Sequence, residues 1–224
     1  MLYEAVTMGS RLFHELESRG SFYNEYLKSE SSSCVRRMTG LNAPVVSRLI
    51  LFLNQWSTHY QTSPEDLLKA LESVAPICKG LNELTLLDTD FDRSFVGEFS
   101  VKDAVRIVFE SVLEAGPRVE ATGTSKILHM INPEFFVMWD GPIRGGYAVG
   151  QSAEDYAKRF LPRVQGQARL AVSQYCEATG VSKSDVIGLL TKCEHTLAKV
   201  IDEFNYVKFT LKRDEVWDEE SRGR

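Results

Sequence analysis

The sequence predicts an all-α protein, because apolar residues recur at helical spacing, helix-start signals repeat and alternating β-type runs are nearly absent. The clearest helix is expected over 100–116. There Ser100 and Asp103 form a serine-x-x-aspartate start, which is typical of a capped helix N-terminus. Apolar residues then repeat at i, i+3 and i+4 until Gly116 and Pro117 end the helix.

The same serine-x-x-aspartate start occurs at Ser63, Ser152 and Ser182, each time ahead of a segment with helical periodicity. Further helices are therefore expected, and they include the ranges 2–18, 44–60, 164–178 and 183–204. The segment 44–60 is apolar nearly all round, which predicts a central, buried helix.

The best strand candidate is Tyr206–Leu211, near the end of the chain. The sequence contains no low-complexity linker and no internal repeat, so we expect one all-helical domain over 1–224, folded as a compact multi-helix bundle. Within it, 1–115 and 116–211 are candidate helical lobes. The segment 212–224 carries charges of both signs and is expected to be frayed.

Composition excludes several classes of protein. The chain has 224 residues, of which 43% are hydrophobic, and a net charge of −5, so it is not a disordered protein. Its longest apolar run is far too short to span a membrane, and its first residues lack the pattern of a signal peptide. A soluble, intracellular protein of the cytoplasm, with no membrane partner, is therefore expected. The oligomeric state is left open.

The cysteines and histidines predict neither a disulfide framework nor a metal site. The four cysteines contain no CxxC pair, which favours reduced thiols that pack as small apolar residues. The histidines form no HExxH pattern. Cys193 and His195 could ligate zinc together only by facing the same way from positions two residues apart on a helix. We therefore expect no metal and no cofactor.

The most informative stretch runs from Ala121 to Tyr147. A glycine-containing turn is expected at Thr122–Thr124, followed by a short helix over Ser125–Ile131. An apolar segment then leads to Asp140. Backbone N–H groups in a turn ahead of a helix can bind an anion, and a carboxylate after bulky apolar residues lies at the edge of a core.

Two motifs in this stretch carry a resemblance to a known family. They are Met138-Trp139-Asp140-Gly141-Pro142-Ile143-Arg144 and Thr122-Gly123-Thr124-Ser125-Lys126. Together they resemble the helix-hairpin-helix DNA glycosylase superfamily, nearest to its archaeal 8-oxoguanine glycosylase branch, and imply a helix-hairpin-helix-like element. The chain departs from the family pattern, because Ala121 replaces the first hairpin glycine and the family's lysine position aligns with Ser125.

The resemblance implies a base-excision repair enzyme acting on damaged duplex DNA. Asp140 would stabilise the positive charge that develops on the sugar, and Lys126 would form a Schiff base in an abasic-site lyase step. The implied base pocket consists of Trp139, Phe136 and Tyr147. The implied DNA-binding residues are Gly123, Thr124, Ser125, Arg144, Lys158, Arg159 and Arg163.

Each of these residues also has a structural interpretation. Asp140 can be a helix N-cap, Lys126 a solvated surface lysine, and Trp139 and Phe136 core residues. His129 is expected to be a core histidine. The basic cluster around Lys158–Arg169 can be a solvated helix face rather than a phosphate-binding surface. The alternative function is therefore a non-catalytic helical protein with a glycosylase-like scaffold that binds nucleic acid or a protein partner.

Overall fold

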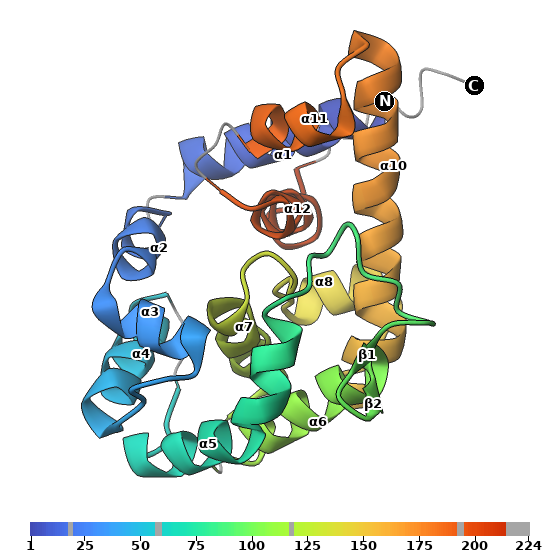
Figure 1. The fold of residues 1–224 in the computed structure, drawn as a ribbon. Coiled ribbons are helices and arrows are strands. Elements are labelled where there is room, and N and C mark those ends of the chain that lie inside the picture. The colour runs from blue at the N-terminus through green and yellow to red at the C-terminus, as the bar shows by residue number, and fades with distance from the viewer. Residues whose placement is uncertain (18–19, 57–59, 117–118, 192–194, 214–224) are drawn as a thin grey trace.

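The computed structural model describes residues 1–17, 20–56, 60–116, 119–191 and 195–213. Within these ranges the chain is mostly helical, which confirms the predicted all-α class (Figure 1). The strands of the described residues are β1 (Phe95–Val96) and β2 (Phe99–Ser100), which form a two-stranded antiparallel sheet. None of the described helices combines the length and apolar character needed to cross a membrane.

The helices follow one another with short connections. Their bounds are α1 Leu2–Leu16, α2 Gly20–Leu27, α3 Glu30–Arg37, α4 Ala43–Gln55, α5 Pro64–Leu81, α6 Val101–Leu113, α7 Ala121–Ile131, α8 Gly141–Gly146, α9 Ala153–Asp155, α10 Leu161–Thr179, α11 Lys183–Thr191 and α12 Leu197–Asn205. Two π-helical segments, Tyr156–Phe160 and Tyr206–Thr210, precede α10 and follow α12. Such segments are often found at functional sites.

The predicted serine caps are formed. The hydroxyl oxygens of Ser63, Ser100 and Ser152 each accept the backbone N–H of the residue three positions later, at 3.0–3.2 Å. Ser182 makes the same bond to Asp185 at 3.4 Å. These bonds satisfy N–H groups that lack a partner within the helix, so they fix where each helix begins.

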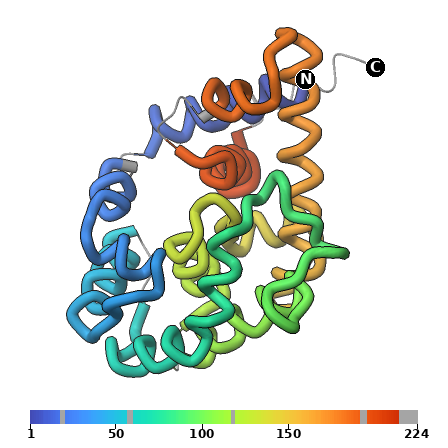
Figure 2. Tube along the Cα trace, in the orientation of Figure 1, coloured from blue at the N-terminus to red at the C-terminus, as the bar shows by residue number. Residues whose placement is uncertain are grey.

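The two ends of the described chain lie side by side. The N-terminal helix α1 packs against α12 and α10, and Figures 1 and 2 show the blue and red segments in contact at one end of the molecule. The pair α5 and α6 forms the opposite end, and α7 lies between. One hydrophobic core runs through all these elements.

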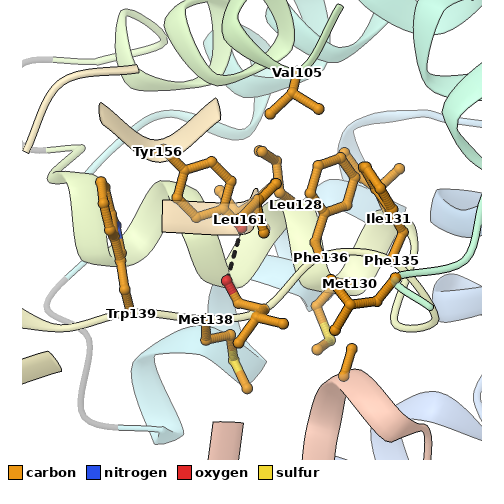
Figure 3. Packing of buried hydrophobic residues seen from close by; sticks show 14 of the residues in the cluster. Val105, Leu128, Met130, Ile131, Phe135, Phe136, Met138, Trp139, Tyr156 and Leu161 are labelled. Atoms are coloured by element: carbon orange, nitrogen blue, oxygen red, sulfur yellow. Dashed lines mark hydrogen bonds between the residues drawn. The ribbon is translucent and has the colours of Figure 1, made fainter. Parts of the chain in front are cut away.

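The segment between α7 and α8 is part of that core. Phe135, Phe136, Met138 and Trp139 are fully or almost fully buried, and Figure 3 shows them packed around α7. The Tyr156 hydroxyl donates a hydrogen bond of 2.7 Å to the backbone oxygen of the residue before Met138. The packing against α7 and the Tyr156 hydrogen bond therefore fix this extended segment before it reaches α8.

Two predictions for the C-terminal region were wrong. The helix expected over 183–204 is divided, because Thr196 begins α12 as its N-cap and also donates a hydrogen bond of 2.5 Å to the backbone oxygen of Pro133. The strand expected at Tyr206–Leu211 is instead a π-helical continuation of α12, in which the Leu211 N–H donates to the Tyr206 carbonyl at 3.0 Å. Tertiary contacts override the local pattern in both cases.

Two further predictions need correction. The helix α4 is buried on one face only, since Leu51 is 62% exposed while Leu49 and Leu53 are inaccessible. The turn expected at Thr122–Thr124 lies inside the first turns of α7, which already begins at Ala121. The expected hairpin element therefore does not occur at this position.

The cysteines that the structure describes, Cys34, Cys78 and Cys176, take part in no disulfide, as predicted. Cys193 lies outside the described residues.

Candidate functional site

Hydrogen bonds join the first turns of α7 to the segment that carries Asp140. The Ser125 hydroxyl oxygen accepts the backbone N–H of Trp139 at 3.2 Å and lies 3.3 Å from the Trp139 carbonyl oxygen. The Trp139 indole N–H donates to the Ala121 carbonyl at 3.0 Å. The neighbours of Ser125 and Trp139 in sequence, Lys126 and Asp140, are thereby held on two adjoining backbone segments.

Asp140 is the N-cap of α8, as one of the two interpretations predicted. Its Oδ1 accepts the Ile143 N–H at 2.8 Å, and its Oδ2 accepts the Thr210 hydroxyl at 2.6 Å. The side chain is half-buried, so its carboxylate is oriented by both neighbours but is not sealed in the core. Thr210 is the last residue of the π-helical segment after α12, and this partner was not predicted from the sequence.

Lys126 is half-buried and extends toward the end of α4. Its Nζ donates to the Trp56 carbonyl at 3.2 Å and lies 5.2 Å from the centre of the Trp56 ring. Burial raises the pKa of Asp202 on α12, and the positive charge of Lys126 is among those that oppose this rise. The Lys126 amine therefore interacts electrostatically with Asp202, a pairing that was not predicted from the sequence.

The residues expected to bind phosphate at the start of α7 do not form an open site. The side chains of Thr124 and Ser125 are inaccessible to solvent, and Gly123 is also buried. The Thr124 N–H already donates to the Glu120 carbonyl at 2.9 Å. Because these groups belong to a packed helix rather than to a turn, the predicted anion site at Gly123–Ser125 was wrong.

The expected base pocket is likewise filled. Trp139 is 1% exposed and Phe136 is inaccessible, so both are core residues, in agreement with the structural interpretation (Figure 3). Trp139 packs edge-on against Tyr156, with ring centres 4.8 Å apart. Tyr147 is half-buried, and its hydroxyl donates to Asn205 Oδ1 at 3.0 Å. Neither Trp139 nor Phe136 is available to stack on a base in this conformation.

Two of the expected DNA-binding cations are paired with acids. Lys158 Nζ lies 3.0 Å from Glu154 and 3.6 Å from Asp103, and Arg159 lies 2.7 Å from Asp155. All three contacts are at the surface, where such pairs are weak and exchange readily. They agree with the interpretation of this cluster as a solvated helix face.

The other two expected DNA-binding cations, Arg144 and Arg163, contact α7 and the C-cap of α8. The Arg144 guanidinium lies 5.4 Å from the centre of the Trp139 ring and 3.4 Å from the Thr122 hydroxyl. Arg163 is exposed and donates to the Tyr147 carbonyl. Arg144 therefore spans the junction between α8 and the first turn of α7, next to the candidate acid.

The structure also reveals a buried ionic cluster that the sequence did not predict. Lys199, Asp202 and Glu203, all on α12, are nearly or completely inaccessible. The Lys199 ammonium lies 2.9 Å from Asp202 and 3.5 Å from Glu203. Burial alone lowers the pKa of Lys199, but the two carboxylates outweigh it and raise the pKa. Charges spaced i, i+3 and i+4 are typical of an exposed helix face, so the pattern gave no signal of burial.

Aromatic side chains surround the same ammonium. Its Nζ lies 4.5 Å from the ring centre of Phe13 and 5.4 Å from those of Tyr23 and Trp56. A cation over aromatic faces is stabilised electrostatically, more strongly when water is excluded. The cluster thus links α1, α2 and the end of α4 to α12.

His129 is a satisfied core histidine, as predicted. Its Nδ1 lies 2.6 Å from the Phe136 carbonyl and its Nε2 lies 2.8 Å from the Tyr23 hydroxyl. Burial lowers the pKa of His129 to about 3, so the ring is neutral near pH 7. Nδ1 then donates to the carbonyl and Nε2 accepts from the tyrosine.

A cavity of about 590 Å³ is lined by residues of α10 and of the segment before β1, with Asp88, Arg169 and Lys183 as its charged groups. It includes none of the residues predicted for catalysis or for the base pocket. Lys183 and Asp88 form an exposed ion pair of 2.7 Å across its rim. It is therefore a separate feature from the Lys126–Asp140 region.

Comparison of the chain with protein-family models, with curated proteins and with solved structures finds no match.

Proposed function

We propose that the protein is an intracellular DNA base-excision enzyme, in which Asp140 and Lys126 act together on the deoxyribose of a damaged nucleotide. The observation that carries the proposal is the Ser125–Trp139 junction, which keeps the amine-bearing turn of α7 beside the residue that precedes Asp140. The motif resemblance of the segment 138–144 to helix-hairpin-helix glycosylases supports the same assignment.

The chemistry requires one carboxylate and one amine. When the bond between C1′ and the base breaks, positive charge develops on the sugar, and an oriented carboxylate stabilises it. The hydrogen bonds from Ile143 and Thr210 fix the Asp140 carboxylate in advance of the reaction. Preorganisation of this kind is what makes such a charge effective in catalysis.

The Lys126 amine supplies the nucleophile. Its nitrogen forms a bond to C1′ as the base leaves with the electron pair of the broken bond, and one proton passes from the amine to the base. Opening of the sugar ring then gives an imine between Lys126 and C1′. Loss of a C2′ proton expels the 3′ phosphate and cleaves the strand, after which water releases the lysine.

Trp139 and Phe136 are buried, so the proposal assigns them to the core and not to the pocket for the damaged base. Under this proposal Arg144, half-buried beside Trp139, is the nearest cation for a phosphate. The basic residues Lys158, Arg159 and Arg163 add sequence-independent attraction to DNA once their surface contacts exchange.

The test is to incubate the protein with duplexes that carry uracil, hypoxanthine, 8-oxoguanine or an abasic site, and to measure base release and strand cleavage. The wild-type protein is expected to release one of the bases or to cleave the abasic strand. Asp140→Asn should abolish base release, and because asparagine is an equally good N-cap it leaves α8 capped. Lys126→Arg retains the charge near Trp56 but should abolish strand cleavage. Asp88→Asn and Lys183→Ala, at an exposed ion pair, are the matched controls and should behave as the wild type.

A second candidate function is a non-catalytic helical protein that binds nucleic acid or a protein partner. The burial of Trp139 and Phe136 favours it, because no described aromatic residue of the motif is open for stacking. Fluorescence anisotropy with undamaged duplex at low salt distinguishes the two. Retention of DNA without base release or strand cleavage would support the second function, and wild-type catalysis lost in Asp140→Asn would exclude it.

A further inference from the structure

Three potential metal ligands meet where α1 packs against α12. His14 lies near the end of α1, Glu203 lies on α12, and His195 directly precedes Thr196, the N-cap of α12. One ligand atom from each of His14, His195 and Glu203 lies within 4.8 Å of the others. His14 lies more than 180 positions before the other two residues in sequence.

The distances fit a tetrahedral ion. His14 Nε2 lies 3.4 Å from Glu203 Oε2. Ligand distances of about 2.1 Å in tetrahedral zinc sites place two ligand atoms roughly 3.4 Å apart. The imidazole rings of His14 and His195 are stacked, with centres 5.0 Å apart and planes inclined by 21°. All three ligand atoms lie within 4.8 Å of one another, so a shift of no more than about 1.4 Å brings any pair to this spacing.

Glu203 has the properties of a ligand. Its side chain is inaccessible, and its Oε1 makes no hydrogen bond among the described residues. A buried carboxylate is stabilised by a cation at each of its oxygens, and Lys199 occupies only the Oε1 side.

The partners of the carboxylate separate the ion from the nearby ammonium. Lys199 approaches Oε1, whereas Oε2 faces His14 and accepts the Ser10 hydroxyl at 2.6 Å. An ion between His14 and His195 on the Oε2 side thus has the carboxylate between itself and Lys199. Ser10 fixes the carboxylate orientation, as outer-shell residues do in metal sites.

We infer that His14, His195 and Glu203 form a binding site for a divalent transition-metal ion of the zinc class, which fastens α1 to α12. Two imidazoles and one carboxylate are a common zinc ligand set, and the partly exposed His14 leaves a fourth position for water. The inference does not depend on the proposed base-excision activity.

The test is titration of the metal-free full chain with Zn²⁺ by calorimetry and with Co²⁺ by visible absorption. One ion per chain, a Co²⁺ spectrum of tetrahedral type and a rise in melting temperature on adding Zn²⁺ are expected. His14→Ala should weaken Zn²⁺ binding by more than about 100-fold, and Ser10→Ala by about 10-fold, the range for an outer-shell residue. Cys34→Ser is the control and should bind as tightly as the wild type.

The inference is overturned if the wild type binds no Zn²⁺ at micromolar concentration, or if His14→Ala binds it as tightly as the wild type. His14 is 40% exposed, so its replacement is expected to leave the fold intact, which circular dichroism checks. Glu203→Gln is the second variant. It should remove the Co²⁺ spectrum, and an unchanged spectrum in this variant also overturns the inference.

Discussion

Two polar regions among the described residues, the α7–α8 junction and the α1–α12 interface, are built in opposite ways. At the junction, Lys126 and Asp140 come from one continuous stretch, are half-buried and are positioned by backbone contacts. At the interface, Lys199 and Glu203 are buried, they pair with each other on α12, and Glu203 accepts the Ser10 hydroxyl from the other end of the chain. The junction is where we propose that a substrate binds, whereas the buried interface is suited to holding the fold together.

The largest expected effect is the difference in unfolding free energy between a variant of the interface and a variant of the junction. Lys199→Met leaves the Asp202 and Glu203 carboxylates buried without their cation, and removal of one partner from a buried ionic cluster costs about 3–5 kcal/mol. Lys126→Met removes a half-buried amine that donates to the Trp56 carbonyl and leaves the buried carboxylates on α12 with their own cation, so its effect should be far smaller. Urea unfolding of both variants measures the difference. Equal losses would contradict the division of roles.

Stability should also fall in acid, because the core residue His129 is buried in its neutral form. The pKa of His129 is about 3 in the folded protein, well below its ordinary value near 6.5, so the unfolded chain binds a proton first. Its contribution is complete above pH 6.5 and is lost as the pH falls toward 3, with a slope of about 1.4 kcal/mol per pH unit. Glu203, with its pKa lowered to about 2, adds a second loss below about pH 4.5.

Denaturant unfolding between pH 7 and pH 4.5 tests the histidine in a range where the Glu203 contribution is complete. His129→Gln should flatten the dependence in that window, because glutamine does not titrate. A slope unchanged in this variant would show that another group governs the acid sensitivity.

A smaller effect tests the junction itself. Ser125→Ala removes the hydroxyl that accepts the buried Trp139 N–H, and an unsatisfied buried N–H costs about 1–3 kcal/mol. Thr124→Val, at an equally buried neighbour whose hydroxyl makes no hydrogen bond among the described residues, is the control and should lose less. If the proposed function holds, Ser125→Ala should also reduce base release, because it loosens the segment that carries Asp140.

The smallest effect on stability is expected for Asp140→Asn. Asparagine accepts the Ile143 N–H as aspartate does, so the change should stay within about 0.5 kcal/mol. A much larger loss in thermal unfolding would mean that the Asp140 charge serves the fold rather than chemistry.

The sequence predicted the parts of this structure that depend on local signals. The serine caps, the course of α6, the core position of His129 and the N-cap role of Asp140 all follow from residues within one or two helical turns. The division of the expected 183–204 helix did not, because it depends on the bond from Thr196 to Pro133, which is distant in sequence. The π-helical segment that carries Thr210 was missed for the same reason.

The candidate site shows the same limit. Lys126 and Asp140 could be chosen from two motifs of one continuous stretch, although the expected turn at Gly123 is a packed helix. The cluster of His14, His195 and Glu203 could not, since its ligand spacing has no local pattern. Charges at 199, 202 and 203 are typical of an exposed face, and only the packing of α1 onto α12 buries them.

The most direct test of the proposed chemistry is borohydride trapping on an abasic duplex, followed by mass-spectrometric mapping of the modified lysine. The amine of Lys126, beside Asp140, is predicted to carry the reduced sugar, and Lys199, buried in its ionic cluster, is predicted to remain unmodified. Absence of any adduct, or an adduct on Lys199 or on surface lysines with Lys126 intact, would contradict the account.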